Sequence, residues 1–264
     1  MTRTIEFANN EISIDQLPAS LQCLIFLLSQ TKNLTSDQVY QSLLHANVTQ
    51  DELMPWATFD HPLTDCYGRQ LVYDGGYFEI MVMSWLPGDV SAIHDHGQAQ
   101  WGAVQCFGQG RHTVYELNDR QQLHTLAELP LFPSRIVEVN HDLIHQMSNY
   151  SQERFLSLHV YGCYDFNDAI TGDARIFDLL EGNIQYTNGG VFFCLPETEI
   201  NHRGQTIDAN YATTLRHHQQ MSDRIIRIVG DSRDSNLNLA YWQSKLGQVE
   251  NAIEELSQTE SLIR

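Results

Sequence analysis

The residues best suited to chemistry in this chain are histidines in two groups that lie far apart in the sequence. The first group is His94-Asp95-His96, and the second is His145 with Asn149 shortly after it. Neutral imidazole is a common ligand of divalent metals. An H-x-H pair by itself is also compatible with an ordinary core or surface position. With the third imidazole of the second group, the sequence predicts a metal site formed by His94, His96 and His145.

The local structure expected around the H-x-H pair is a strand. Alternate residues of a strand face the same way, so His94 and His96 would both enter one cavity while Asp95 points away from it. His141 could replace His145 as the third ligand, but only His145 is followed by an asparagine at the H-x3-N spacing. The histidines that match no motif have no assigned role: His112, His124, His217 and His218.

The elements that must bring the two groups together are short strands. Beyond Tyr67 the chain consists of runs rich in Val, Ile, Phe and Tyr that are separated by Gly, Pro, Asn and Asp. Many short antiparallel strands at this spacing predict a mainly β fold, either a sandwich or a closed jelly-roll barrel. The expected strands are 70–73, 77–85, 101–107, 111–117, 135–139, 145–148 and 155–161.

Helices are expected before the strands. Apolar residues recur at helical spacing over 14–28, and a second helix should begin with Ser36 as its N-cap and end before Pro55. Residues 1–62 are therefore interpreted as a helical cap and 63–165 as the barrel that carries the metal site. The remainder, 166–264, is interpreted as a C-terminal extension.

Two elements are expected in this extension. Gly189 and Gly190, followed by an apolar run, predict a hairpin that ends at Pro196. A stripe of apolar residues near the C-terminus predicts an amphipathic helix that either packs on the core or forms a dimer seam. This stripe consists of Trp242, Leu246, Val249, Ile253, Leu256 and Ile263.

Composition narrows the class of protein. A chain of 264 residues with 42% hydrophobic content can bury the core of one large domain and is not of the disordered class. A net charge of -18 argues against nucleic acid and anionic membranes as partners, and we expect a monomer or small homo-oligomer. No signal peptide or membrane span is expected. Five single cysteines favour a reducing compartment, so a cytoplasmic location is expected.

The two histidine groups resemble the two halves of a known motif. The pattern G-x5-H-x-H that starts at Gly88, with the H-x3-N that starts at His145, resembles the metal motif of the cupins. Many cupins carry a glutamate ligand shortly after the H-x-H pair, but residues 97–102 contain no carboxylate. The resulting neutral three-histidine set resembles that of the cysteine dioxygenase family. This resemblance implies a cupin barrel and Fe(II) as the cofactor.

The resemblance to this family extends through two further segments. The run that starts at Tyr67 resembles the family segment whose arginine holds the substrate carboxylate, which implies a substrate-binding role for Arg69 and Tyr67. Ser157, His159 and Tyr161 resemble the family's S-x-H-x-Y strand. They share one strand face, so they could form a hydrogen-bonded chain toward the metal, and the resemblance implies a catalytic role. Taken alone, Arg69 is compatible with a surface ion pair. The three strand residues, taken alone, are compatible with a polar strand face whose groups are all hydrogen-bonded.

One region departs from the family pattern. Some members carry a cysteine just after the H-x-H pair that crosslinks to the tyrosine matching Tyr161, whereas Trp101 and Gly102 occupy this region here. We therefore expect a free phenol at Tyr161. Trp101 would narrow the cavity if its ring faced inward.

The resemblance implies an enzyme that uses Fe(II) and O2 to oxidise L-cysteine, or a related small thiol carboxylate, to the sulfinic acid. Arg69 favours L-cysteine, because enzymes of this family that act on 3-mercaptopropionate often have glutamine at that position. A 3-mercaptopropionate enzyme is nevertheless an alternative. Two others are a non-redox metal cupin, such as a zinc or manganese isomerase or hydrolase, and a ligand-binding cupin sensor, which the unassigned extension keeps open.

Overall fold

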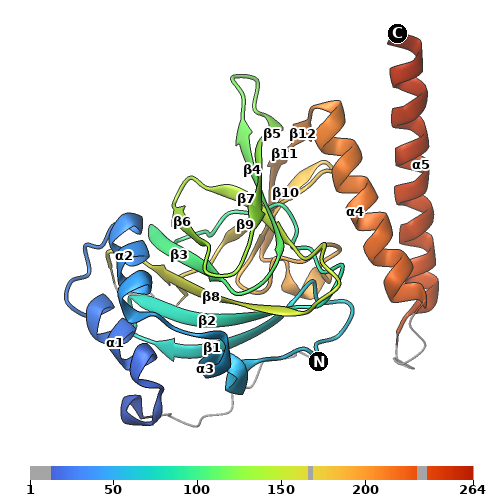
Figure 1. The fold of residues 1–264 in the computed structure, drawn as a ribbon. Helices are drawn as coiled ribbons and strands as arrows, with labels where there is room; N and C mark the ends of the chain where they lie inside the picture. Colours follow the sequence, from blue (N-terminus) through green and yellow to red (C-terminus); the bar gives the residue numbers. More distant parts are fainter. Residues whose placement is uncertain (1–12, 166–168, 231–236, 264) are drawn as a thin grey trace.

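Three β-sheets form the centre of the protein, in a computed structural model that describes residues 13–165, 169–230 and 237–263 (Figure 1). The first sheet contains, in spatial order, β1 (Gly68–Asp74), β2 (Phe78–Trp85), β8 (Phe155–Gly162), β3 (Trp101–Cys106) and β6 (Ile136–Asn140). The second contains β12 (Asp208–Ala209), β5 (Gln122–Leu131), β4 (Gly110–Leu117) and β7 (Ile144–Ser148). The third contains β11 (His202–Thr206), β10 (Asn183–Thr187) and β9 (Ala174–Asp178).

An irregular segment, residues 90–94, joins the second and third sheets. Val90 and His94 each form a β-bridge with β7, to Ser148 and His145 respectively, and His94 forms another with Ile176 of β9. The segment thus lies between β7 and β9, opposite the first sheet. This arrangement is a double-sheet jelly roll, which confirms the predicted mainly β fold.

Strand β8 is central to the fold because both of its faces are buried. Its alternate residues Leu156, Leu158 and Val160 pack into the apolar cluster shared with the N-terminal helices. The other face turns toward the barrel interior and carries Phe155 and Tyr161, with Ser157 and His159 between them. Since side chains alternate along a strand, one run of sequence supplies both an apolar outer face and a polar inner face.

The N-terminal helices cover the outer face of the first sheet (Figure 1). The expected helix over 14–28 is split in the structure, because Pro18 lies between a 3-10 turn, Ile14–Gln16, and α1, Ala19–Leu28. Proline has no backbone N–H and a fixed φ, so it starts α1 and cannot continue a helix that precedes it.

The second helix, α2 (Ser36–Ala46), is capped by Thr35 and not by Ser36 as predicted. Thr35 and Gln38 form a reciprocal capping box, in which each side chain accepts a hydrogen bond from the backbone of the other. The hydroxyl of Ser36 is free to donate to the carbonyl of Val139 in β6, which fastens α2 to the first sheet. A short α3, Gln50–Leu53, follows before Pro55.

The structure of the C-terminal extension differs from the structure that the sequence predicted. Residues 189–193 form no strand, so the hairpin expected there is wrong. The hairpin of this region is β9–β10, and Gly189 and Gly190 belong to the irregular chain after it. Its turn is made at Gly182, whose φ of +63° suits glycine.

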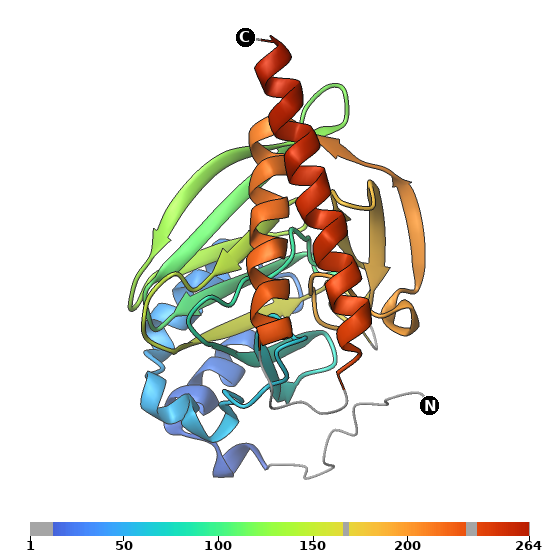
Figure 2. The same cartoon turned by 90° about the vertical axis from the view of Figure 1, so that its right-hand side faces the viewer.

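Two helices end the described chain, α4 (Tyr211–Gly230), which the sequence did not predict, and α5 (Leu239–Ile263), which it did. They run side by side along one flank of the barrel (Figure 2). Trp242 and Val249 of α5 are buried in the same apolar cluster as the barrel interior, as the core-packing interpretation expects. The side chain of Ile263 lies outside the described residues. None of the described helices is long and apolar enough to cross a bilayer.

Candidate metal centre

His94, His96 and His145 meet inside the barrel. One nitrogen from each lies within 4.8 Å of the others, and all three side chains are buried. Their ring centroids are 4.6 to 5.3 Å apart. The backbone N–H groups of His94 and His145 each donate to the carbonyl of the other, at 3.0 and 2.8 Å, so this bridge sets the distance between the two histidine groups. Of the groups within the described chain, this is the set with the geometry to hold a metal ion.

The H-x-H pair does not lie on a regular strand, contrary to the prediction. Only His94 makes β-bridges, and Gly97, with a φ of +54°, turns the chain directly after His96. Asp95 is buried, and its carboxylate accepts hydrogen bonds from the backbone N–H groups of Gly97 at 3.1 Å and Arg175 at 2.8 Å, and from Arg175 Nε. Asp95 therefore holds the loop to β9 and does not face solvent.

The outer nitrogens of two of these histidines have partners. His94 Nδ1 is 2.8 Å from the carbonyl of Ala92, which can only accept, so Nδ1 carries the hydrogen and Nε2 is left for a metal. His145 Nδ1 is 2.8 Å from His112 Nε2, and His145 Nε2 is 3.1 Å from His96 Nε2. A metal ligand must present a free lone pair, and these contacts leave Nε2 of the imidazoles pointing together.

Burial keeps these imidazoles neutral. It lowers the pKa of His94 to about 4 and the pKa values of His96 and His145 well below the ordinary histidine value. Burial also lowers the pKa of His112 to about 4. Neutral imidazole is the form that binds a metal, so the donor set fits a divalent cation such as iron or zinc. His141 is exposed and bonds to the carbonyl of Ala99, away from this group.

A second hydrogen-bonded chain approaches the three histidines along β8. Trp85 Nε1 donates to Ser157 Oγ at 2.8 Å. Ser157 Oγ is 2.7 Å from His159 Nε2, and His159 Nδ1 is 2.7 Å from Tyr161 Oη. The ring of Tyr161 lies 4.9 Å from that of His96. The structure therefore brings Ser157, His159 and Tyr161 together beside the converging histidines of the candidate metal site.

The direction of this chain follows from its first member. Indole nitrogen can only donate, so Ser157 Oγ accepts from Trp85 and offers its own hydrogen to His159 Nε2. His159, whose pKa burial lowers to about 3, then carries its hydrogen on Nδ1 and donates to Tyr161 Oη. Burial raises the pKa of Tyr161, so the phenol keeps its hydrogen and can donate it into the cavity. Trp85 was missed in the sequence because no motif marks it.

The cavity beside the histidines is narrow, about 30 Å3 in volume, and is partly open to solvent. Arg69 lines it, with Nε 3.2 Å from Met81 Sδ and Nη2 3.5 Å from Thr171 Oγ1. Among the described residues, no carboxylate forms an ion pair with Arg69. Asp95, which was expected to point away from the cavity, also lines it, and other walls come from Tyr67, Met81, Met83, Tyr161, Ala174, Gly189 and Val191. His94 and His96 line the same cavity, and His145 lines an adjoining one together with Tyr67, Met83, His94 and Tyr161.

Tyr67 lies at the junction of barrel and extension. Its hydroxyl accepts a hydrogen bond from the backbone N–H of Val191 at 3.2 Å, and its ring lies 4.9 Å from that of Trp85. Burial raises the pKa of Tyr67 to about 12. Residues 189–191, where a strand was expected, are thus irregular chain that forms one wall of the cavity.

Trp101 does not narrow the cavity. Its ring packs in the cluster under the N-terminal helices and covers Gly162, where a Cβ would approach the ring to 2.1 Å. Gly102, in contrast, is in register with Tyr161, and a Cβ there would lie 3.1 Å from Tyr161 Cδ1. The side of Tyr161 that faces β3 thus meets a glycine, which offers no group for a crosslink.

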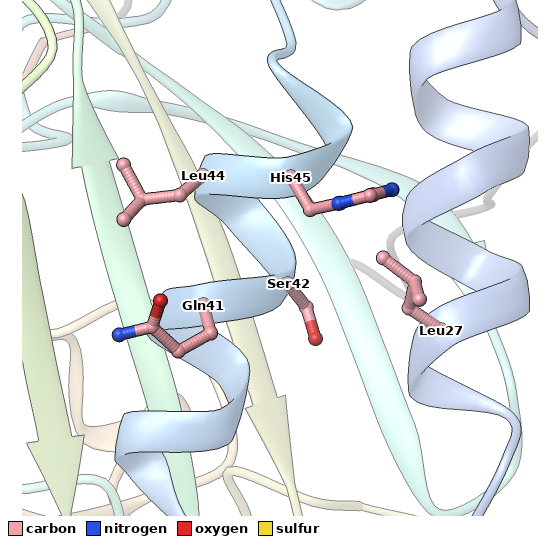
Figure 3. Close-up of a pocket in the computed structure, with 5 residues that line it drawn as sticks. All are labelled: Leu27, Gln41, Ser42, Leu44 and His45. Atoms are coloured by element: carbon pink, nitrogen blue, oxygen red, sulfur yellow. The ribbon is translucent and has the colours of Figure 1, made fainter.

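A more spacious hollow lies between α1 and α2 (Figure 3). It is lined by Leu27, Gln41, Ser42, Leu44 and His45. Its one titratable group, His45, is exposed and has no second metal-ligating side chain beside it. The hollow therefore has room but no convergent chemistry, and the smaller cavity is the candidate site.

Comparison with known proteins agrees with this site. Residues 8–167 match the model of the family described as cysteine dioxygenase type I. This chain belongs to that family. Cysteine dioxygenase type 1 of Danio rerio is 28% identical over 153 residues, which cover 54% of this chain and 75% of the relative. The matched range contains all eight site residues that the sequence predicted, whereas the cavity walls at Thr171, Ala174, Gly189 and Val191 lie beyond it.

Solved structures similar to this chain include two barrel proteins. A protein with a double-stranded β-helix domain from Klebsiella pneumoniae is 15% identical, with a TM-score of 0.34, and the match covers 46% of this chain and 91% of that one. A cupin 2 conserved barrel domain protein from Salinispora arenicola is 18% identical, with a TM-score of 0.29, over 40% of this chain and 79% of that one.

Proposed function

We propose that this protein is an Fe(II)- and O2-dependent dioxygenase that converts L-cysteine, or a related small thiol carboxylate, to the sulfinic acid. The observation that carries the proposal is that three buried neutral imidazoles converge at a cavity whose lining includes His94, His96, the guanidinium of Arg69 and the phenol of Tyr161. Membership of the cysteine dioxygenase type I family supports it.

Arg69 selects the substrate by charge in this proposal. Its guanidinium lines the cavity and, among the described residues, forms no ion pair with a carboxylate. A planar guanidinium binds a carboxylate through two parallel hydrogen bonds, which fixes the orientation as well as the position of the substrate. Met81 and Met83 form an apolar wall that suits the short methylene chain of a thiol carboxylate. Tyr67 closes the same wall and holds it to Val191.

His94, His96 and His145 would hold the iron as neutral ligands. The chemistry supplied by the bound cation is a lowered pKa of the coordinated thiol and the activation of O2. In the overall reaction both oxygen atoms of O2 end on sulfur, which is oxidised by four electrons as O2 is reduced, so no further reductant is required. The contribution of the protein is to hold the thiol and the carboxylate of the substrate in one orientation.

Tyr161 is the hydrogen-bond donor of the proposed site. The chain from Trp85 through Ser157 and His159 directs hydrogen bonds toward Tyr161 Oη and leaves the phenolic hydrogen for the cavity. From there it can donate to an oxygen atom of the substrate carboxylate or of the forming sulfinate. His159 and Ser157 orient the phenol and do not touch the substrate.

The experiment that tests the function measures metal and turnover together. Purified protein should contain iron, and the iron-loaded protein should consume one O2 for each L-cysteine converted to cysteine sulfinic acid. 3-Mercaptopropionate, measured in parallel, decides which thiol carboxylate is preferred. Full zinc occupancy with no iron-dependent O2 uptake for either thiol would refute the proposal and favour a non-redox metal protein.

The proposed setting is the cytoplasm. All five cysteines are free thiols, which suits a reducing compartment. We also propose that the protein acts as a monomer or small homo-oligomer without a nucleic acid or membrane partner. Its net charge of -18 repels both the phosphate backbone of nucleic acid and anionic membrane surfaces.

A further inference from the structure

His112 lies directly behind one of the three metal-binding imidazoles. Its Nε2 atom is 2.8 Å from Nδ1 of His145, and the two rings meet edge to face with centroids 4.9 Å apart. The contact is set by the sheet, because β4 and β7 are paired with His112 opposite Met147 and Val114 opposite His145. The side chain of His112 is buried, so water does not compete for this hydrogen bond.

The position of one hydrogen atom decides what this contact does. A neutral imidazole carries a hydrogen on one nitrogen and a lone pair on the other. His145 Nε2 is the atom that converges with the other ligands, so it must be free of hydrogen to bind a metal. The hydrogen of His145 then lies on Nδ1 and is donated to His112 Nε2. In the reverse arrangement His112 would donate, and His145 would carry its hydrogen on Nε2 and bind no metal there.

His94 and His145 are held by different kinds of acceptor. The Nδ1 of His94 meets the carbonyl of Ala92, which fixes the tautomer because a carbonyl cannot donate. The acceptor for His145 is another imidazole, which can donate or accept. His112 Nδ1 is itself buried and has no hydrogen-bond partner among the residues that the structure describes. The tautomers of His112 and His145 are therefore linked to each other.

We propose that His112 is a positioning residue of the metal site, which accepts the Nδ1–H hydrogen bond of His145 and so keeps His145 Nε2 available to the metal. This rests on the metal site of the proposed function and is independent of the substrate. Partners of this kind, behind a metal ligand, typically contribute 10- to 100-fold to metal affinity. His112 lies within the family-matched range but belongs to none of the motifs that carry the resemblance.

The test measures metal binding, with no thiol or O2 present. Apo-protein is titrated with Co2+, followed by its visible absorption, for the wild type and for His112→Phe and His112→Gln. Phenylalanine keeps a ring but has no acceptor, and we expect Co2+ to bind ~10- to 100-fold more weakly. Glutamine offers an amide oxygen that can accept from Nδ1–H, so its affinity should return to within about tenfold of the wild type.

His124→Phe is the matched control. His124 lies on the neighbouring strand β5, and its Nε2 pairs with Glu116 at 2.9 Å, so it is a histidine of the same sheet without contact to the three ligands. Its variant should bind Co2+ like the wild type. Wild-type affinity for His112→Phe would overturn the proposal, and so would an equal loss in the Phe and Gln variants, because the effect would then be one of packing.

A second measurement needs no variant, in case His112→Phe does not fold. Nitrogen NMR of the Zn2+-loaded wild type, labelled with 15N-histidine, should show His145 protonated at Nδ1 and a scalar coupling between this nitrogen and His112 Nε2. Protonation of His112 at Nε2 would refute the proposal. Failure of the proposed function has a different signature, since a protein that binds Co2+ as described but oxidises no thiol leaves the role of His112 intact.

Discussion

This protein contains two groups of similarly buried histidines, one in the candidate metal centre and one on α4, and the two groups have different surroundings. His217 and His218, on α4, have their Nδ1 atoms 3.2 Å apart, and the ring of His217 packs against Phe193. Burial lowers the pKa of His217 to about 3 and also lowers that of His218. By burial and pKa alone this pair resembles the three histidines of the metal centre.

The difference lies in where the nitrogens point. In the metal centre, the outer nitrogens of His94 and His145 have protein partners and the inner ones converge beside a cavity. In the α4 pair the two Nδ1 atoms face each other, and the described residues offer no third metal-ligating side chain in range. Burial alone therefore does not make a candidate metal site, because the nitrogens must also converge beside a cavity that gives access.

The largest effect should come from removing one converging nitrogen. His145→Ala is expected to abolish stoichiometric iron binding, because two imidazoles and water replace a three-histidine site. His217→Phe should retain full iron content, measured by elemental analysis of both proteins. Equal iron content in the two variants would show that the metal binds elsewhere.

Arg69→Ala tests whether the cavity beside the metal centre binds an anion. Loss of a bidentate charged contact costs about 2 to 3 kcal/mol, so KM for L-cysteine should rise roughly 30- to 150-fold at constant iron content. Arg120→Ala, on the exposed turn between β4 and β5, is the control and should leave KM unchanged. An unchanged KM in both variants would remove Arg69 from the substrate site.

Tyr161→Phe tests the phenol that the metal centre has and the α4 pair lacks. Turnover should fall ~10- to 100-fold while iron content and ring packing are kept. The control is Tyr115→Phe, which removes another buried hydroxyl, bonded to Gln146 at 3.2 Å, without touching the cavity. If only the unfolding free energy of Tyr161→Phe fell and kcat did not, Tyr161 would be a core residue. The intact mass of the wild type should show no crosslink at Tyr161.

The smallest effect concerns the α4 pair. His217 has a pKa of about 3 in the folded protein and about 6.5 when unfolded, so below pH 6.5 the unfolded chain binds a proton that the folded chain cannot. The contribution of neutral His217 to stability is fully present above pH 6.5 and is lost as the pH falls toward 3. Between pH 7 and pH 5, the unfolding free energy of the His217→Phe variant should therefore fall by less than that of the wild type. The difference should reach up to about 2 kcal/mol, measured by denaturant titration. Parallel curves for both proteins would contradict the buried neutral state of His217.

The sequence predicted most elements whose patterns are local. The strands around β2, β3 and β8 carry dense β-branched and aromatic runs, and the stripe from Trp242 marks α5. It missed β5, in which few residues are buried, and α4, in which buried His217 and Arg224 take positions on the face where an apolar stripe would be expected. The proposed division at residues 62 and 165 stays a prediction.

For the site, sequence alone determined which chemical groups are available: three imidazoles, one arginine and an alternating Ser-His-Tyr face on β8. Only the tertiary structure decided which groups bond the outer nitrogens of His94 and His145, because these partners, the carbonyl of Ala92 and the imidazole of His112, are connected to the ligands by no spacing rule. It also decided that residues 189–191 close the cavity and that Trp101 faces away from it. The physical reason is the distance along the sequence over which each effect acts. Side-chain alternation acts within one strand, whereas hydrogen-bond partners across the barrel depend on how the sheets close.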